Sequence, residues 1–225
     1  MSWALTPLTY IVFTMTESGR LRKRCSLVVM AKSPVPGQVK TRLIPFIGSQ
    51  CATQVYQDLL SRILQELVQV EASSVLSCTP DTHHAMLRSF SSQYGWRRRY
   101  QGQGDLGNRM ARIFSRCQRE SDYTIIVGSD LANINKQIIY QCIDRLTAGN
   151  DLVLGATEDG GYGLIAMSRL HSGVFRKIPW STDRVLQVTM SRARQMKLKT
   201  AIINGLWDVD TYKDYRRWRQ LCQQD

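Results

Sequence analysis

The chain has 225 residues, of which 43% are hydrophobic and 21% are charged, with 30 Lys and Arg against 18 Asp and Glu. This composition is close to that of ordinary globular domains and excludes a disordered or fibrous chain. The formal net charge of +12 suits a protein that binds nucleic acid, and equally an enzyme whose substrate bears phosphate or carboxylate groups.

The six cysteines are scattered through the chain without a Cys-x-x-Cys pair, and there are only three histidines. We therefore expect reduced, buried thiols in a cytoplasmic protein and no Cys/His zinc site. No apolar run approaches the roughly 20 residues needed to span a bilayer, so no membrane span is expected.

Residues 1–24 are predicted to form a poorly ordered N-terminal extension ahead of a single domain at 25–225. The fairly apolar stretch Trp3–Met15 precedes a basic cluster, which is the reverse of the order in a secretory signal. Met15 is a candidate initiator, and a surface anchor is the alternative role for the extension.

From there the pattern of apolar residues predicts strands that alternate with helices. The predicted strands are Ser26–Met30, Ser74–Cys78, Arg98–Gln101, Tyr123–Val127, Asp151–Ala156, Gly163–Met167 and Lys199–Ile203. The predicted helices begin at Gln50, with Ser49 as N-cap, and at Thr79-Pro80-Asp81, and cover Leu106–Cys117, Asn135–Leu146, Thr182–Gln195 and Thr211–Cys222.

This alternation predicts an α/β fold in which a mostly parallel sheet is covered by helices on both faces, a three-layer α/β/α sandwich. Ligands of such sheets bind outside the carboxyl ends of the strands. The residues that follow the strands are therefore the candidates for function.

The loop after the first strand holds three basic residues in a stiff frame. Pro34, Pro36 and Gly37 restrict the turn, so that Lys32, Lys40 and Arg42 could meet the phosphates of a substrate. The loop is neither a Walker loop nor a glycine-rich dinucleotide fingerprint. A rigid loop with solvated charges is the alternative.

Three aspartates follow buried strands. Asp130 comes directly after Tyr123–Val127, while Asp208 and Asp210 precede the last helix. One or two carboxylates together with substrate phosphates are typical ligands of Mg²⁺. A turn role for Asp130 and a helix cap for Asp210 are the alternatives.

Two smaller motifs lie further along. Asp159-Gly160-Gly161-Tyr162 forms a turn in which a carboxylate could meet a hydroxyl or an amine, although an ordinary hairpin also favours Asp-Gly. Trp180-Ser181-Thr182 offers a ring for packing, followed by a plausible cap.

With these motifs in order, the chain resembles the bacterial DUF2064 family of glycosyltransferase-A-fold proteins, which are associated with radical-SAM and arsenosugar pathways. The matching segments are Met30–Leu43, Gly102–Met110, Gly128–Asp130, Asp159–Tyr162, Trp180–Thr182 and Asp208–Asp214. The family is similar in fold to nucleotide-diphospho-sugar transferases and to the guanylyltransferases of molybdopterin and deazaflavin cofactor synthesis, all GT-A-like and Rossmann-like.

The resemblance implies a role for each motif. Asp130, Asp159 and Asp210 would be catalytic, with Mg²⁺ or Mn²⁺ on Asp130, Asp208 and Asp210. Nucleotide or phosphate would meet Lys32, Gly37, Lys40, Arg42, Gly104, Asp105, Gly107 and Arg109. The substrate would meet Gly160, Gly161, Tyr162, Trp180, Ser181 and Thr182.

The sequence departs from the family pattern beside two of these motifs. Leu131-Ala132 stand where Cys-Pro is usual, Gly163 replaces a second Tyr, and Ala166 replaces a Gly. The metal and phosphate positions are retained, so activity is expected with an altered acceptor pocket.

Three functions remain open at this point. The first is a metal-dependent glycosyltransferase that uses a nucleotide sugar and a small acceptor. The second is a nucleotidylyltransferase that uses a nucleoside triphosphate, although its usual Leu-Ala-x-Gly-x-x-x-Arg loop is absent. The third, from another class, is a basic nucleic-acid-binding module.

Overall fold

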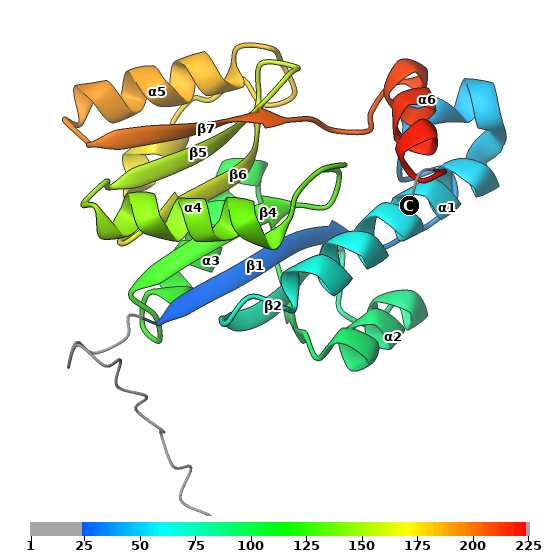
Figure 1. Ribbon diagram of the computed structural model, residues 1–225, viewed down its shortest axis with the longest axis horizontal. Helices are drawn as coiled ribbons and strands as arrows, with labels where there is room; N and C mark the ends of the chain where they lie inside the picture. Colours follow the sequence, from blue (N-terminus) through cyan, green and yellow to red (C-terminus); the bar gives the residue numbers. More distant parts are fainter. Residues whose placement is uncertain (1–23, 224–225) are drawn as a thin grey trace, which may run out of the picture.

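The computed structural model of the protein describes residues 24–223 (Figure 1). Seven strands form one sheet in the order β3-β2-β1-β4-β6-β5-β7. Their bounds are β1 Cys25–Lys32, β2 Ser73–Thr79, β3 Arg97–Tyr100, β4 Tyr123–Gly128, β5 Leu152–Thr157, β6 Tyr162–Met167 and β7 Thr200–Leu206. All neighbouring strands pair in parallel except β6, which is antiparallel to both β4 and β5.

Helices cover both faces of this sheet, which confirms the predicted three-layer α/β/α architecture. One layer contains α1 Ile44–Leu67, α2 Ala85–Tyr94 and α4 Lys136–Thr147, and the other contains α3 Leu106–Cys117 and α5 Val185–Gln195. Helix α6, Tyr212–Leu221, packs instead on the first part of α1, as Figure 1 shows at the right. Two 3₁₀ turns, η1 Thr41–Leu43 and η2 Ser172–Phe175, complete the elements.

Strands β1 and β4 have continuous apolar sequences because they lie at the centre of the sheet. Val28 and Val29 point to opposite faces of β1 and are both fully buried, because a helix layer lies over each face. Burial on both faces removes the apolar and polar alternation of a half-exposed strand.

One predicted helix start was wrong. The helix expected from Thr79-Pro80-Asp81 begins only at Ala85, since Asp81 Oδ1 accepts a hydrogen bond from the His83 amide at 2.6 Å and holds a local turn. Helix α1 begins earlier, at Ile44, but is interrupted at Gly48, whose φ of 77° and ψ of 162° are not helical. The helix predicted from Gln50 is the part of α1 that follows this kink, and Ser49 lies at its start.

The remaining elements lie within three residues of their predicted bounds, and several helix caps are visible. Asn135 caps α4 through Ile138, and Thr211 forms a capping box with Asp214 at the start of α6. Thr182, expected as the first residue of a helix, lies three residues before α5 and accepts a hydrogen bond from the Arg184 amide.

The prediction that all cysteines are buried was wrong in part. Cys25, Cys78 and Cys142 are buried, Cys117 is half-buried, and Cys51 and Cys222 are exposed on the surfaces of α1 and at the end of α6. Cys51 lies in the apolar-rich α1 but on its outer side, which the spacing of its neighbours could have indicated.

Thiol reagents should distinguish these cysteines in the folded protein. Burial raises the pKa of the Cys25 and Cys78 thiols to about 12, so these thiols stay protonated and shielded. Titration with a disulfide reagent at pH 8 should modify Cys51 and Cys222 first, and Cys25, Cys78 and Cys142 only after unfolding. Rapid native modification of Cys142 in peptide mass spectra would contradict the fold.

No described helix is both long and apolar enough to cross a membrane. The predicted extension lies outside the described residues except for Arg24. The Arg24 amide donates to Asp122 Oδ2 at 2.8 Å, and this contact holds the start of β1 against the start of β4.

Candidate functional site

Asp130 and Asp210 come together because the chain after β7 crosses the end of β4. Leu131 and Asp208 form an isolated antiparallel bridge, and the Val209 amide donates to the Asp130 carbonyl at 3.0 Å. These backbone bonds place two carboxylates that are 80 positions apart in the sequence at the same edge of the sheet.

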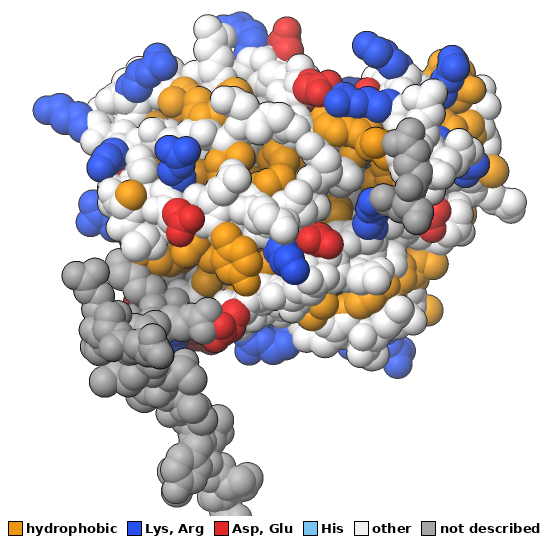
Figure 2. All heavy atoms as spheres, viewed as in Figure 1, with side chains coloured by type: hydrophobic (Ala, Val, Ile, Leu, Met, Phe, Trp, Pro, Cys, Tyr) orange, Lys and Arg blue, Asp and Glu red, His pale blue; other side chains and the backbone are white. Residues whose placement is uncertain are grey.

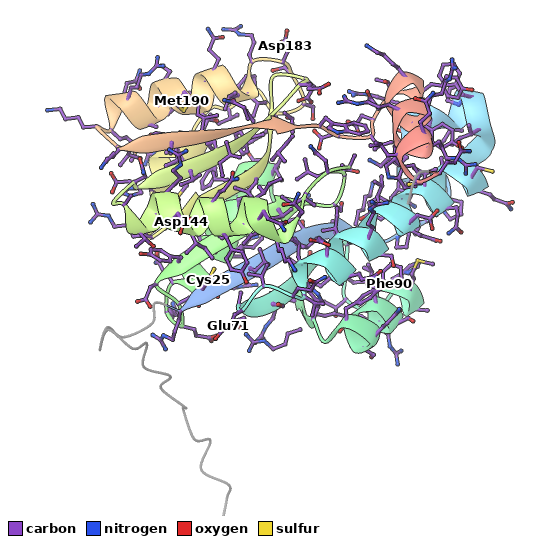
Figure 3. All side chains as sticks on the ribbon, in the orientation of Figure 1. Cys25, Glu71, Phe90, Asp144, Asp183 and Met190 are labelled. Atoms are coloured by element: carbon purple, nitrogen blue, oxygen red, sulfur yellow. The ribbon has the colours of Figure 1, made fainter. Side chains whose placement is uncertain are left out.

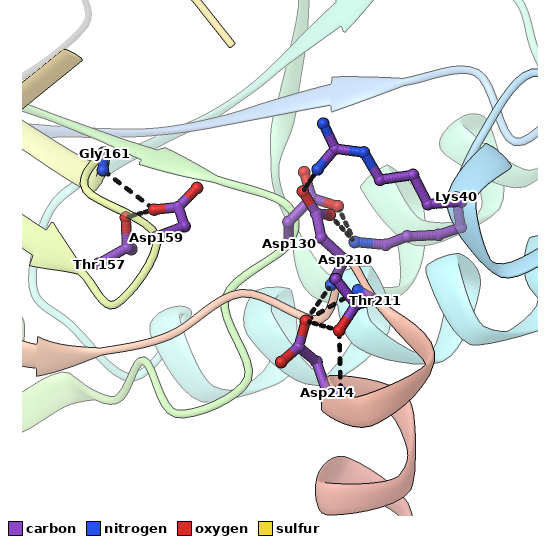
Figure 4. Close-up of polar contacts among 9 residues, drawn as sticks. Lys40, Asp130, Thr157, Asp159, Gly161, Asp210, Thr211 and Asp214 are labelled. Carbon is purple, nitrogen blue, oxygen red and sulfur yellow. Dashed lines mark hydrogen bonds and ion pairs between the residues drawn. The ribbon is translucent and has the colours of Figure 1, made fainter. Parts of the chain in front are cut away.

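Lys40 reaches into this pair of carboxylates from the loop after β1 (Figure 4). Its Nζ forms an ion pair with Asp130 Oδ1 and lies 3.4 Å from Asp210 Oδ1, and its side chain is only 2% exposed. Arg42 lies 3.6 Å from the second oxygen of Asp210. The residue types singled out in the first loop and after the strands therefore meet at one point.

The backbone of Lys40 is in the left-handed region, with φ 48° and ψ 41°. A non-glycine residue adopts this conformation at a cost in energy, and such residues concentrate at functional sites. Ser181, with φ 65°, is a second example. Both side chains lie around the cavities described below.

The electrostatics of this cluster shift several pKa values. Burial alone would lower the pKa of Lys40, but Asp130 and Asp210 outweigh it and the net pKa is raised. Burial raises the pKa of Asp208 to about 7, and the charges of Asp130, Asp159 and Asp210 act in the same direction. Burial also raises the pKa of Asp210, against the effect of Lys40.

Within residues 24–223, no three His, Cys, Asp or Glu side chains gather closely enough to form a ready-made metal cage. Asp130, Asp208 and Asp210, the predicted metal ligands, are therefore near one another but do not converge as a triad. Asp130 and Asp210 do converge on one cation-sized group, the Lys40 ammonium. Their side chains are 44% and 43% exposed, which leaves oxygen atoms accessible from outside.

Two cavities meet at these carboxylates. The larger, about 540 Å³, opens over the ends of β4 and β6 and is lined by Arg42, Asp130, Asp159, Asp208, Asp210, Gly161, Tyr162, Trp180, Ser181, Thr182 and Asp183 among others. The smaller, about 220 Å³, lies against the first loop and contains Lys32 and Lys40. Arg42, Ser129, Asp130 and Asp210 line both, so the cluster divides one continuous site into two parts.

Asp159 is fixed on the far side of the larger cavity. Its Oδ1 accepts hydrogen bonds from Thr157 Oγ1 at 2.6 Å and from the Gly161 amide at 3.0 Å (Figure 4). Gly160 has φ +86°, and a Cβ there would lie 2.1 Å from the Asp183 carbonyl oxygen, so only glycine fits. The tight Asp-Gly-Gly turn thus holds one carboxylate toward the cavity.

The loop Gly102–Arg109 has a mainly structural arrangement. Asp105 caps α3 by accepting from the Asn108 amide at 2.7 Å, and Arg109 Nε donates to the Gly104 carbonyl at 2.9 Å. A Cβ on Gly107 would lie 2.9 Å from the Trp180 ring, so this glycine admits Trp180 to the cavity wall. Gly104, Asp105, Gly107 and Arg109 line neither of the two cavities.

The loop after β1 is closed by its own contacts. Lys32 Nζ donates to the Gln38 carbonyl at 2.8 Å, and Gly37, with φ +82°, lets the chain turn between them. The amides of Ser33, Val35 and Gln38 are bonded to carbonyls of Thr79, Ser33 and Val35. Since the Lys32 amide donates to Tyr56 and positions 34 and 36 are prolines, no free amide remains between Lys32 and Pro36.

Sequence reasoning missed Tyr56, which was taken as part of the apolar stripe of α1. Its hydroxyl accepts from the Lys32 amide at 2.7 Å and donates to the Lys32 carbonyl at 3.0 Å, and it lines the smaller cavity. The one available signal was a phenol within an otherwise aliphatic stripe. The ion pair of Glu158 with Arg217 at 2.9 Å, which joins the turn to α6, had no signal in the sequence.

Two of the departures from the family pattern, Leu131 and Gly163, pack against each other in the structure. A Cβ on Gly163 would lie 2.5 Å from Leu131 Cδ2 and 2.8 Å from its Cγ, while Leu131 is 1% exposed. Leu131 therefore occupies the space that a side chain at position 163 would need.

Substituting Gly163 by Ala should lower the free energy of unfolding by about 1–3 kcal/mol through overpacking. In the Leu131→Ala/Gly163→Ala double variant the loss should be smaller than the sum of the two single losses, as urea denaturation can measure. Gly128→Ala, where the nearest atom lies at 3.6 Å, is the matched control. Additive losses would show that the two positions are independent.

No curated protein matches this sequence, but solved structures share the fold. A protein assigned as a nucleotide-diphospho-sugar transferase from Desulfovibrio desulfuricans G20 is 24% identical, over 90% of this chain and 98% of its own, with a TM-score of 0.77. CMP:2-keto-3-deoxy-manno-octonic acid synthetase complexed with CTP is 12% identical, over 89% and 99% of the chains, with a TM-score of 0.58.

Glucosyl-3-phosphoglycerate synthase from Mycobacterium tuberculosis, in complex with Mn²⁺, uridine-diphosphate and phosphoglyceric acid, is 14% identical, over 89% of this chain and 76% of its own, with a TM-score of 0.51. At these identities the likeness shows the fold alone. It confirms the predicted GT-A-like, nucleotide-diphospho-sugar transferase fold.

The family model described as an uncharacterized protein conserved in bacteria, DUF2064, matches residues 63–182. This is more than half of the chain and includes Asp130, Asp159 and Trp180. The chain therefore belongs to the DUF2064 family.

Proposed function

We propose that the protein is a divalent-cation-dependent glycosyltransferase that transfers a sugar from a nucleotide sugar to a small acceptor. The main supporting observation is that Lys40 and Arg42 meet Asp130 and Asp210 where the two cavities join. Cations beside a pair of accessible carboxylates suit a diphosphate that leaves as a dianion or trianion.

Asp130 and Asp210 fit a divalent cation, because both already reach the same ammonium group of Lys40. They would hold Mg²⁺ or Mn²⁺ together with substrate phosphates, and the ion would supply charge neutralisation of the leaving diphosphate. The complex of glucosyl-3-phosphoglycerate synthase with Mn²⁺ and uridine-diphosphate supports this by similarity of fold. Asp208 is the third carboxylate beside them.

The chain's own residues divide the remaining work between the two cavities. Lys40 and Arg42 bind phosphate oxygens at the junction. Asp159, oriented by Thr157 and Gly161, accepts a hydrogen bond from a sugar or acceptor hydroxyl in the larger cavity. Trp180 and Tyr162, which pack edge to face at 6.5 Å between ring centroids, form a wall against a ring and exclude water.

Nucleotidyl transfer is the second candidate, supported by the fold shared with the CTP complex of CMP:2-keto-3-deoxy-manno-octonic acid synthetase. The loop after β1 favours the first candidate. Its amides at Ser33, Val35 and Gln38 are bonded within the loop or to β2, and Pro34 and Pro36 have none. The stretch Ser33–Pro36 therefore offers no free amide to a triphosphate.

One assay separates the two reactions. The purified chain is incubated with Mn²⁺, a panel of nucleotide sugars or nucleoside triphosphates, and candidate acceptors, and the released product is identified. Release of nucleoside diphosphate, lost in Asp130→Asn, is expected. Release of pyrophosphate from a triphosphate would establish nucleotidyl transfer instead, and binding of neither donor class in calorimetry would falsify both.

The face shown in Figure 2 gives no support to the nucleic-acid alternative. On the face shown in Figure 2, Lys and Arg side chains are scattered between polar and apolar ones and do not form a continuous basic strip. We expect no shift of generic DNA or RNA in a binding assay at 50 mM salt, where phosphate contacts would be strongest.

A further inference from the structure

A third cavity, of about 250 Å³, lies between the C-terminal end of α3 and the edge strand β3. Its lining residues are Ser26, Val28, Val75, Ser77, Arg97, Arg99, Ile113, Arg116, Cys117, Arg119 and Glu120. None of these residues lines either cavity of the candidate site. It is therefore a separate recess on the face of the sheet that α3 covers.

The recess is strongly basic. Four arginines and one glutamate surround it, so positive charge exceeds negative charge by three. Arg97 donates to Ser73 Oγ and Arg116 donates to the Tyr100 carbonyl at 3.0 Å. The side chains of Arg99, in β3, and Arg119 make no hydrogen bond or ion pair with any residue in the described part of the chain.

A buried hydroxyl provides an independent indication of a ligand. Ser77 is 1% exposed, and its Oγ has no hydrogen-bond partner among residues 24–223. A buried polar atom without a partner costs stability, so such atoms usually meet a protein group, water or a ligand. Ser77 lines the recess, and a bound molecule there would satisfy its hydroxyl.

The inner wall is apolar. Val28 is fully buried, and Val75 and Ile113 are 8% and 5% exposed. Together with the arginines and the hydroxyl, this wall makes a site with an apolar part for a ring and a basic part for negative charge. Arginine forks match phosphate oxygens particularly well.

We propose that this recess binds an organic phosphate of nucleotide size, with its phosphates on Arg99 and Arg119 and its ring against Val28, Val75 and Ile113. The proposal is independent of the transferase reaction, because the two sites share no residue. A recess of about 250 Å³ fits one small molecule better than the extended backbone of a nucleic acid.

Cys117 supplies a local readout because it lines the recess and is half-buried. The full chain is alkylated at pH 9 in the presence of EDTA, with and without ADP, and each cysteine is quantified by peptide mass spectrometry. ADP should slow the alkylation of Cys117 and leave Cys51 and Cys222 unchanged. Adenosine, which lacks phosphate, should give little protection.

The Arg99→Ala/Arg119→Ala variant should need about tenfold more ADP, or more, for the same protection. Arg88→Ala/Arg194→Ala, which removes two exposed arginines elsewhere, should behave as the parent. Ser77→Ala should weaken protection without lowering the melting temperature, since the hydroxyl it removes has no partner in the folded chain. This variant keeps the test valid if the double arginine variant folds poorly.

Three results would overturn the proposal. One is unchanged alkylation of Cys117 at millimolar ADP and millimolar pyrophosphate. Another is protection that persists in both Arg99→Ala/Arg119→Ala and Ser77→Ala. The third is protection by a single-stranded 20-nucleotide DNA that is stronger than that by ADP and is lost in the Arg88→Ala/Arg194→Ala control, which would indicate a diffuse nucleic-acid surface.

Discussion

Replacing Asp130 by Asn should lower kcat/KM of the proposed transfer by at least about 100-fold while the fold is retained. Asp130 follows the central strand β4, forms an ion pair with Lys40 and lines both cavities of the site. The amide keeps the shape of the side chain but removes the charge that a divalent cation or a lysine would meet. Mn²⁺ affinity, measured by calorimetry, should fall in parallel.

The matched control is Asp144→Asn, an exposed aspartate on α4 that lies outside the site (Figure 3). It removes the same charge and should leave both activity and Mn²⁺ affinity unchanged. Circular dichroism and melting temperature establish that each variant is folded. If Asp130→Asn retains activity within about threefold of the parent, the assignment of the site would be wrong.

The second large effect concerns stability as a function of pH, in the absence of metal. The pKa of Asp208 is raised to about 7 by burial and then by Asp130, Asp159 and Asp210. A folded-state pKa above the unfolded value means that the folded chain binds the proton more tightly. The contribution of Asp208 to stability is therefore full below about pH 4 and is lost as pH rises through 7.

Asp208→Asn removes this titration. At pH 8 the variant should be more stable than the parent by about 4 kcal/mol, and at pH 4 the two should be nearly equal. Urea denaturation at pH 4, 6 and 8 with EDTA measures the difference, and Asp144→Asn should show no such trend. Equal stability of Asp208→Asn and the parent at pH 8 would mean that Asp208 is more hydrated than the structure indicates.

The strands were the elements best determined by local sequence. The runs that became β1 and β4 are apolar and β-branched because both faces are buried, and that burial needs no knowledge of strand order. The helix after Pro80 was misplaced because the Asp81 side chain satisfies the His83 amide. Such short-range competition between a turn and a helix is not encoded in hydrophobic periodicity.

The sequence predicted several residues of the site, but it did not predict how these residues are arranged. The sequence placed Lys40, Asp130 and Asp210 after separate strands, which is why all three were candidates. It could not indicate that the Lys40 ammonium lies between the two carboxylates, since this depends on the crossing of the segment after β7 over the end of β4. Asp105 and Arg109, chosen by resemblance, proved to be engaged in capping α3 and bonding Gly104.

The sequence by itself determined the layer architecture, the mostly parallel sheet and the edge of that sheet where polar residues gather, because burial and chain order act locally. Only the tertiary structure decided which charges share a site and which do not. Among the 30 Lys and Arg, Lys40 and Arg42 lie at the acidic cluster and four arginines surround a separate recess. Contacts between segments far apart in the chain decide where each charge lies, and composition contains no information about these contacts.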